Sequence, residues 1–130
     1  MSAFVDTSVL VRHLVGDPPA MAKRATSFLR SADHLFLTDL IVAETIYVLE
    51  SFYEVDRQQV AESMRSLIAM NSIAVIDTAQ LLRALEIYEL HRIDFAESYL
   101  IASAESTDVA QIASFDRSMD RVKTVTRVES

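Results

Sequence analysis

Short apolar runs alternate along the chain with longer segments in which apolar residues recur every three or four positions. The first run, Ala3-Phe4-Val5, is followed by Asp6, Thr7 and Ser8, which are residue types that start helices. Runs of this length that contain β-branched residues and stop at a helix start predict strands. The predicted strands are residues 3–5, 35–37, 73–76 and 112–115, with a last short strand near 122–125.

The segments between these runs have the spacing of helices packed on one side. Gly16-Asp17-Pro18-Pro19 is the strongest break between two of them. The predicted helices are 9–15, 20–32, 40–53, one after Asp56, one after Asp77 and one that begins at Asp94. Strands that alternate with helices favour a parallel sheet covered on both faces, because parallel neighbours need helical crossovers. The pattern therefore predicts the α/β class.

Length and composition predict one domain, residues 1–130. The chain has 130 residues, of which 51% are hydrophobic, so it can bury a core without metal or disulfide crosslinks. It has no cysteine, which excludes disulfides, thiolate metal sites and cysteine nucleophiles. A single glycine excludes the glycine-rich loops that bind dinucleotides and nucleotide phosphates.

The N-terminus has no basic leader followed by a long apolar run, so we expect no signal peptide. No window approaches the roughly 18 apolar residues of a spanning helix, so we expect a cytoplasmic protein with no membrane contact. Twelve Lys and Arg against nineteen Asp and Glu give 12 − 19 = −7. This charge repels nucleic acid unless bound cations reverse the local field, and it favours a basic partner protein.

Acidic residues follow the predicted strands. In an open parallel sheet, ligands bind beyond the carboxyl ends of the strands, where Asp6 and Asp116 stand. Either one by itself is explained as a helix cap or turn residue. Asp77 also follows a strand, but Thr78 and an ordinary helix come next, so capping is sufficient there.

Three further acids lie on helices. Glu44 is in the middle of a strongly apolar segment with no broad polar face, which slightly favours a functional role over a solvated position. Asp94 and Glu97 share the first turn of a helix, where the helix dipole also favours acids. Carboxylates gathered in one pocket would repel one another unless Mg²⁺ or Mn²⁺ lay between them. Such ions activate water and neutralise charge on a phosphodiester.

These motifs together resemble the PIN-domain nucleases, and among them the VapC-like toxins of bacterial toxin–antitoxin pairs. The resemblance covers nearly the whole chain and rests on four segments, namely Phe4–Leu10, Asp39–Glu44, Asp94–Ala102 and Ser114–Arg117. It implies a three-layer α/β/α fold with a short central parallel sheet of four to five strands. It also implies a metal-dependent endoribonuclease that uses Mg²⁺ or Mn²⁺ to hydrolyse RNA.

The resemblance implies a set of metal-binding and catalytic acids. The expected core is Asp6, Glu44, Glu97 and Asp116, with Asp94 as a supporting or substitute ligand. Glu97 departs from the family, which most often has Asp at this position, and Ser8 stands where Asn is more usual. Ser8 is expected either to hydrogen-bond a carboxylate or metal-bound water, or to serve only in capping.

Other polar residues are open to two interpretations. The three histidines, at 13, 34 and 91, show no ligand spacing and are expected to be structural or exposed. The C-terminal basic residues either bind RNA phosphates or form a solvated face. These residues are Arg117, Arg121, Lys123 and Arg127.

The family resemblance implies a small antitoxin as a partner. Segment 40–53 has more apolar surface than a sheet can cover, and Met64, Ile68 and Met70 are expected to add to it. We expect a homodimer in which an amphipathic antitoxin helix lies between these two helices. A basic antitoxin side chain would enter the carboxylate cluster.

Three alternatives stand beside the nuclease interpretation. A receiver domain would need paired acids after the first strand, and a haloacid-dehalogenase-like phosphatase would need an Asp where Ser8 stands. The third alternative is a PIN-like binding module whose metal site has degraded. An acid at each expected position argues against the degraded module, although Glu97 leaves room for it.

Overall fold

The computed structural model describes residues 1–129 in two compact units; residue 130, the last of the expected domain, lies outside the described residues. Unit 1 is Met1–Ile76, and unit 2 begins at Asp77 and takes in the rest of the described chain. No described helix is both long enough and apolar enough to cross a membrane.

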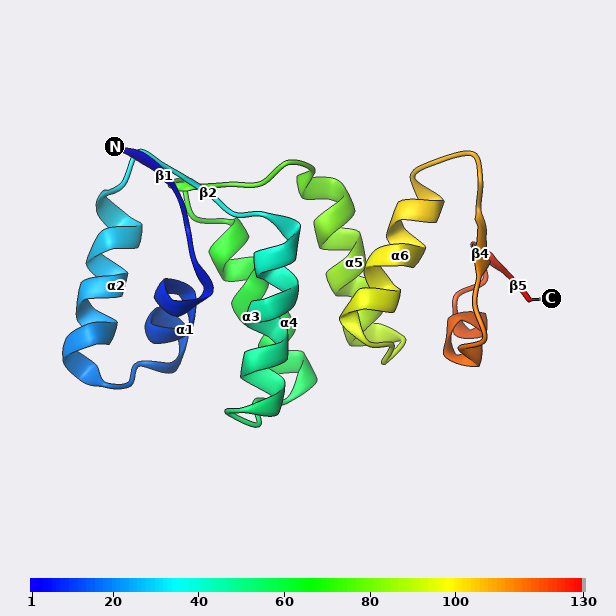
Figure 1. The fold of residues 1–130 in the computed structure, drawn as a ribbon, viewed down its shortest axis with the longest axis horizontal. Helices are drawn as coiled ribbons and strands as arrows, with labels where there is room; N and C mark the ends of the chain where they lie inside the picture. Colours follow the sequence, from blue (N-terminus) through cyan, green and yellow to red (C-terminus); the bar gives the residue numbers. More distant parts are fainter. Residues whose placement is uncertain (130) are drawn as a thin grey trace. The chain divides into compact units, whose positions relative to one another are not determined.

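Unit 1 contains three short strands and four helices (Figure 1). Its helices confirm the predicted ones to within a few residues, and the Gly16–Pro19 break separates the first two. The first two strands have the predicted length but begin one residue earlier, and the third is shorter than predicted. In chain order the elements are β1 (Ser2–Phe4), α1 (Thr7–Val15), α2 (Pro19–Ser31), β2 (His34–Phe36), α3 (Asp39–Ser51), α4 (Arg57–Ile68) and β3 (Ile73–Ala74).

The strands of unit 1 form a parallel sheet in the order β1-β2-β3. Leu35 is opposite Ala3 on one side and Ile73 on the other. The connections from β1 to β2 and from β2 to β3 run in the same direction across the sheet. Connections between parallel strands are nearly always right-handed, so both place their helices on the same face of the sheet. Figure 1 accordingly shows α1 to α4 below the strands of this unit.

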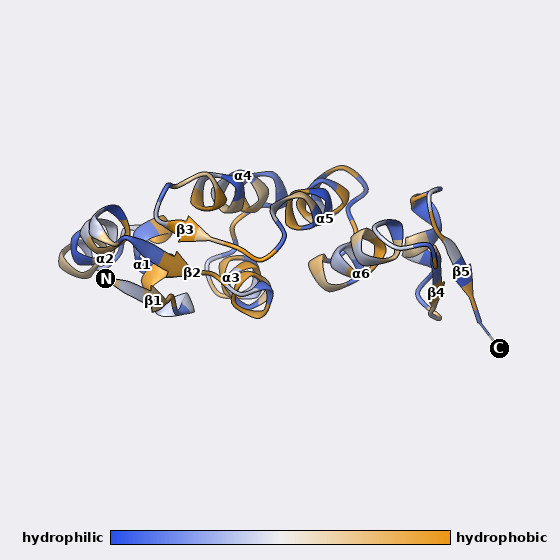
Figure 2. Ribbon diagram, turned by 90° about the horizontal axis from the view of Figure 1, so that it is seen from above, coloured by the Kyte–Doolittle hydropathy of each residue, from blue (hydrophilic) through white to orange (hydrophobic). Residues whose placement is uncertain are grey.

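The two faces of this sheet differ in burial. Val5, Leu35 and Leu37 are buried on the helix side, whereas Phe4 is 75% and Phe36 41% exposed on the other side. The rings of these two phenylalanines are 5.4 Å apart. Taken by itself, unit 1 thus has helices on only one face of its sheet. The sequence pattern had predicted helices on both faces. Figure 2 shows the apolar character of β2 and β3.

Unit 2 contains a helix pair and a two-stranded parallel sheet. Tyr88 on the first helix packs edge to face against Phe95 on the second, with ring centroids 6.3 Å apart. The paired strands place Ile112 opposite Arg127. The elements are α5 (Thr78–Leu90), α6 (Phe95–Glu105), β4 (Gln111–Ala113), the 3-10 helix η1 (Arg117–Arg121) and β5 (Thr126–Val128).

The last strand lies further along the chain than predicted. The sequence pattern placed it near 122–125, but Val122 ends the 3-10 helix and is buried, and the strand begins at Thr126. Val122 is therefore apolar because it is buried at the end of a helical turn, and not because it belongs to a strand. The α/β class is confirmed, and all five described strands pair in parallel. They form a three-stranded sheet in unit 1 and a two-stranded sheet in unit 2, where one central sheet of four to five strands was expected.

The expected apolar surface on α3 and α4 needs a correction. Met64 is only 1% exposed and belongs to the core of unit 1, so it adds nothing to an exposed face. Ile68 and Met70 are half-buried. Exposed apolar area does occur on α3, where Leu40 is 77% and Tyr47 67% exposed.

Candidate functional site

Asp6 stands at the carboxyl end of β1 and is the N-cap of α1. Its Oδ2 accepts hydrogen bonds from the backbone N–H of Ser8 at 3.2 Å and from the Ser8 hydroxyl at 2.8 Å. These bonds favour the ionised carboxylate and lower the pKa of Asp6. Ser8 thus does bind a carboxylate, as one of its two interpretations predicted.

Glu44 projects from the middle of α3 into solvent. Glu44 is therefore solvated, which was one of the two positions considered for it from the sequence. Its exposed neighbours on the helix, Leu40 and Tyr47, are largely apolar. The burial cost inferred from the sequence does not arise. Within residues 1–129, Glu44 makes no hydrogen bond or ion pair, so its carboxylate is available to a ligand.

Asp6 and Glu44 line one open pocket of about 300 Å³ in unit 1. Thr7 also lines this pocket, and its hydroxyl is buried and has no hydrogen-bond partner within the described chain. Buried hydroxyls are nearly always hydrogen-bonded to protein or water, so a water molecule is the expected partner of this one. The other lining residues are Ser8, Val11, Arg12, Val48 and Tyr53.

The donor set of this pocket fits a hard divalent cation. Magnesium commonly binds one or two carboxylates and keeps several waters, and Asp6 and Glu44 supply two carboxylates. No group of three or more His, Cys, Asp or Glu side chains that could hold a metal occurs among residues 1–129.

The other three candidate acids belong to unit 2. Asp94 is the N-cap residue of α6, although its side chain makes no capping hydrogen bond, and Glu97 is in the first turn. Asp94 is exposed and Glu97 half-buried. The two acids therefore share one end of α6, as predicted. Their convergence with Asp6 and Glu44 in one site stays a prediction.

Asp116 repeats the arrangement of Asp6. It follows β4, is the N-cap of η1 and accepts a hydrogen bond from the backbone N–H of Ser118 at 2.9 Å. Hydrogen bonds from the side chain and backbone of Ser118 lower the pKa of Asp116, and the nearby Arg121 and Arg127 act in the same direction. Ser118 was not among the residues predicted from the sequence. The repeated Asp-x-Ser spacing, at 6–8 and 116–118, would have identified it.

The C-terminal basic residues are mostly engaged in holding unit 2 together. Arg127 pairs with Asp120 and Glu129. Arg121 donates to the backbone oxygens of His91 and Arg92, and Lys123 donates to that of Asp120. Three of the four residues thus have structural partners, which weakens their expected role as phosphate ligands.

Two further interpretations from the sequence are resolved. Asp77 caps α5 by accepting from the backbone N–H of Gln80 at 3.0 Å. His13 shares a 2.8 Å hydrogen bond with Thr26, and burial lowers the pKa of its imidazole. This histidine is structural, as expected, and joins α1 to α2.

Comparison with known protein families identifies the chain at family level. The family model described as PIN domain matches residues 3–125, which includes all five candidate acids. A search for similar curated proteins gave no significant match. PIN domains are generally nucleases and typically depend on metal ions, and this assignment excludes the receiver-domain and phosphatase alternatives. The chain belongs to the PIN-domain family.

Proposed function

We propose that this protein is a metal-dependent endoribonuclease and the toxin of a toxin–antitoxin pair. One observation carries the nuclease proposal: Asp6 and Glu44 line one open pocket, in a chain that matches the PIN domain over residues 3–125. That single match extends across both units, which supports treating them as one domain.

The proposed metal ligands are the five acids of the two units, with Mg²⁺ or Mn²⁺ as the ion. When bound, the ion would activate a water and neutralise charge on the scissile phosphate. Ser8 donates two hydrogen bonds to Oδ2 of Asp6, which favour the ionised carboxylate and orient it. Glu44 supplies the second carboxylate of the pocket. The acids of the set are Asp6, Glu44, Asp94, Glu97 and Asp116.

Substitutions that keep size but remove charge test this site. Asp6→Asn and Glu44→Gln are expected to reduce Mg²⁺- or Mn²⁺-dependent RNA cleavage at least ~100-fold, while the melting temperature without metal stays within a few degrees of the wild type. Asn retains an acceptor oxygen for the cap of α1. Added Mg²⁺ should raise the melting temperature of the wild type, because it binds only the folded site, and raise that of the variants less.

Glu62→Gln is the matched control, since Glu62 is exposed on α4 of the same unit and does not line the pocket of Asp6 and Glu44. It should cleave and bind metal like the wild type. Cleavage that survives Asp6→Asn or Glu44→Gln would remove that residue from the site. RNA binding without cleavage at any metal concentration would establish the degraded binding module instead.

Asp94 and Glu97 are proposed to be unequal. Glu97 is half-buried and Asp94 exposed, which favours Glu97 as the inner ligand. Glu97→Gln is therefore expected to lose more activity than Asp94→Asn under the same assay. Full activity in Glu97→Gln together with none in Asp94→Asn would reverse the order.

The toxin role is proposed from the resemblance of the four motifs to VapC-like toxins, and the cytoplasmic location from the sequence. The homodimer and the antitoxin are proposed on two further grounds. The net charge of −7 favours a basic partner, and α3 exposes Leu40 and Tyr47 to solvent. An antitoxin Lys or Arg beside Asp6 and Glu44 would replace the charge of the metal and so block hydrolysis.

A further inference from the structure

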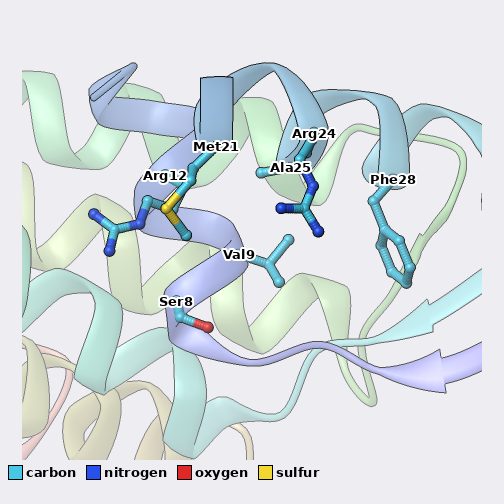
Figure 3. A pocket seen from close by; sticks show the side chains of 7 residues that line it. All are labelled: Ser8, Val9, Arg12, Met21, Arg24, Ala25 and Phe28. Carbon is cyan, nitrogen blue, oxygen red and sulfur yellow. The ribbon is translucent and has the colours of Figure 1, made fainter. Parts of the chain in front are cut away.

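A second hollow adjoins the carboxylate pocket in unit 1. It has a volume of about 280 Å³, and Ser8 and Arg12 line both of them. Figure 3 shows Ser8 and Val9 from the α1 side, with Arg24 and Phe28 from α2. The lining residues are Ser8, Val9, Arg12, Met21, Arg24, Ala25 and Phe28.

The same surface continues along α2. A third hollow of about 610 Å³ shares Arg24 and Phe28 with the second. Lys23 adds another positive charge there, and neither hollow is lined by an acidic residue. We call this surface, formed by Arg12, Lys23, Arg24 and Phe28, the α1–α2 groove.

The groove has a composition that contrasts with the acidic chain. Arg24 is exposed and makes no ion pair within residues 1–129, and Arg12 makes only a long hydrogen bond, 3.4 Å, to the backbone oxygen of Asp17. Phe28 is 40% exposed and is four residues from Arg24, so the ring and the guanidinium lie on one side of α2. The guanidinium of Arg24 and the exposed ring of Phe28 thus lie on the same side of α2, and Arg12 lines the same hollow.

We propose that the α1–α2 groove binds single-stranded RNA that leaves the carboxylate pocket. Arg12 and Arg24 contact successive phosphates, and a base stacks on Phe28. Basic side chains beside an exposed aromatic ring are the features by which proteins hold unpaired strands without reading their sequence. The inference rests on the proposed ribonuclease function, because it takes RNA as the ligand of the neighbouring pocket.

Binding without hydrolysis separates this inference from the nuclease proposal. The probe is a fluorescein-labelled, unstructured RNA of about 12 nucleotides, which is within the site sizes of single-strand binders. Its affinity for the full chain is measured by anisotropy in EDTA over a series of salt concentrations. The variants are Arg24→Gln, Phe28→Leu and Phe28→Tyr, with Arg30→Gln as the matched control, since Arg30 is exposed on the same helix outside the groove.

The two groove residues should differ in how they act. Arg24→Gln is expected to reduce the slope of log affinity against log salt by about 0.7, the value for one lost phosphate contact on a single strand. Phe28→Leu should weaken binding by about 5-fold or more without changing that slope, and Phe28→Tyr should bind like the wild type. A duplex of the same sequence should bind more weakly.

Three results would overturn the groove: no binding by the wild type, wild-type affinity in both Arg24→Gln and Phe28→Leu, or an equal loss in Arg30→Gln. Cleavage with Mg²⁺ is scored separately. Groove-dependent binding in a protein that cleaves nothing would support the groove and contradict the nuclease proposal. Cleavage by a protein whose binding ignores both groove residues would do the reverse.

Discussion

At the residue scale, Asp6 shows that capping and metal binding are compatible. Both hydrogen bonds from Ser8 go to Oδ2, so the cap of α1 uses one carboxylate oxygen and leaves the other. Removing the cap altogether costs about 1 kcal/mol of stability. Asp6→Ala would therefore lose stability as well as charge, and Asp6→Asn is the cleaner test of the proposed ligand.

Glu105 forms the best-defined ion pair of unit 2. Its two oxygens accept from Nε and Nη2 of Arg83 at 2.7 and 2.8 Å, and it also accepts from the hydroxyl of Thr124. The hydrogen bonds from Arg83 are the main cause of the lowered pKa of Glu105. Hydrogen bonds to charged groups stabilise a fold by about 1.5–3 kcal/mol in well-formed cases.

Glu105→Gln is expected to destabilise the protein by about 1–2 kcal/mol at neutral pH. Because the folded pKa of Glu105 lies below its unfolded value of about 4.3, its contribution is present above that value and is lost as pH falls through the folded pKa. The wild type should thus lose stability in acid more steeply than the variant. Thermal unfolding between neutral pH and about pH 3 measures this difference.

Glu86 provides the control for Glu105. It also pairs with Arg83, at 2.5 Å, but its side chain is half exposed. Exposed pairs contribute little, so Glu86→Gln should change stability by less than about 0.5 kcal/mol and leave the acid limb unchanged. Equal losses in the two variants would show that the Glu105 pair has no special role.

At the scale of the element, Gly16 determines how α1 ends. Its φ is +79°, a left-handed conformation in which its N–H bonds to the backbone oxygen of Arg12 at 3.0 Å. A Cβ atom at this position would cause no steric clash, because no other atom lies within 4 Å of the place it would take. Any cost of a side chain here therefore comes from the backbone conformation.

Gly16→Ala is expected to destabilise the protein by about 1 kcal/mol, since L-residues disfavour this conformation by about 1–2 kcal/mol and alanine recovers part of that in the unfolded chain. Chemical denaturation measures the change. Ala110 has φ +51° and gives the converse control, because Ala110→Gly should not destabilise. A loss in Ala110→Gly with none in Gly16→Ala would contradict the argument.

At the scale of the whole molecule, the acidic charge and the exposed side of α3 concern partners. Leu40 and Tyr47 are the large apolar side chains that α3 leaves in solvent, and Met64 is withdrawn into the core. Exposed apolar residues that lie together mark interaction surfaces. The homodimer and the antitoxin complex both remain predictions about this surface.

The purified protein is expected to sediment as a dimer, and Tyr47→Ser should shift it towards monomer. Leu82→Ser, a change of an exposed leucine on α5, is the control. A complex recovered from native cells should contain a small protein with a basic tail, and proteolysis of that protein, but not added Mg²⁺, should restore cleavage. A protein that stays monomeric at high concentration and has no basic partner would contradict the homodimer and the antitoxin, but not the nuclease proposal.

The sequence by itself determined the helices and the positions of most strands. Helix boundaries depend on local signals such as Thr38, Asp56 and Asp77, whose side chains accept hydrogen bonds at the starts of α3, α4 and α5. The break at Gly16–Pro19 is equally local. These signals act over a few residues, which is why they could be predicted without a structure. The four family motifs extended the same prediction to the PIN-domain assignment.

Only the tertiary structure decided what depends on distant neighbours. Strand pairing limits β3 to Ile73–Ala74, although the apolar run continues to Ile76. Met64 is buried on the same face of α4 as Val60 and Leu67, so it is part of the core and not of an exposed surface. The pocket shared by Asp6 and Glu44, and the hydrogen bonds of Arg121 to the backbone of His91 and Arg92, join residues far apart in the chain. Such contacts arise from register and packing, which no local pattern of residues specifies.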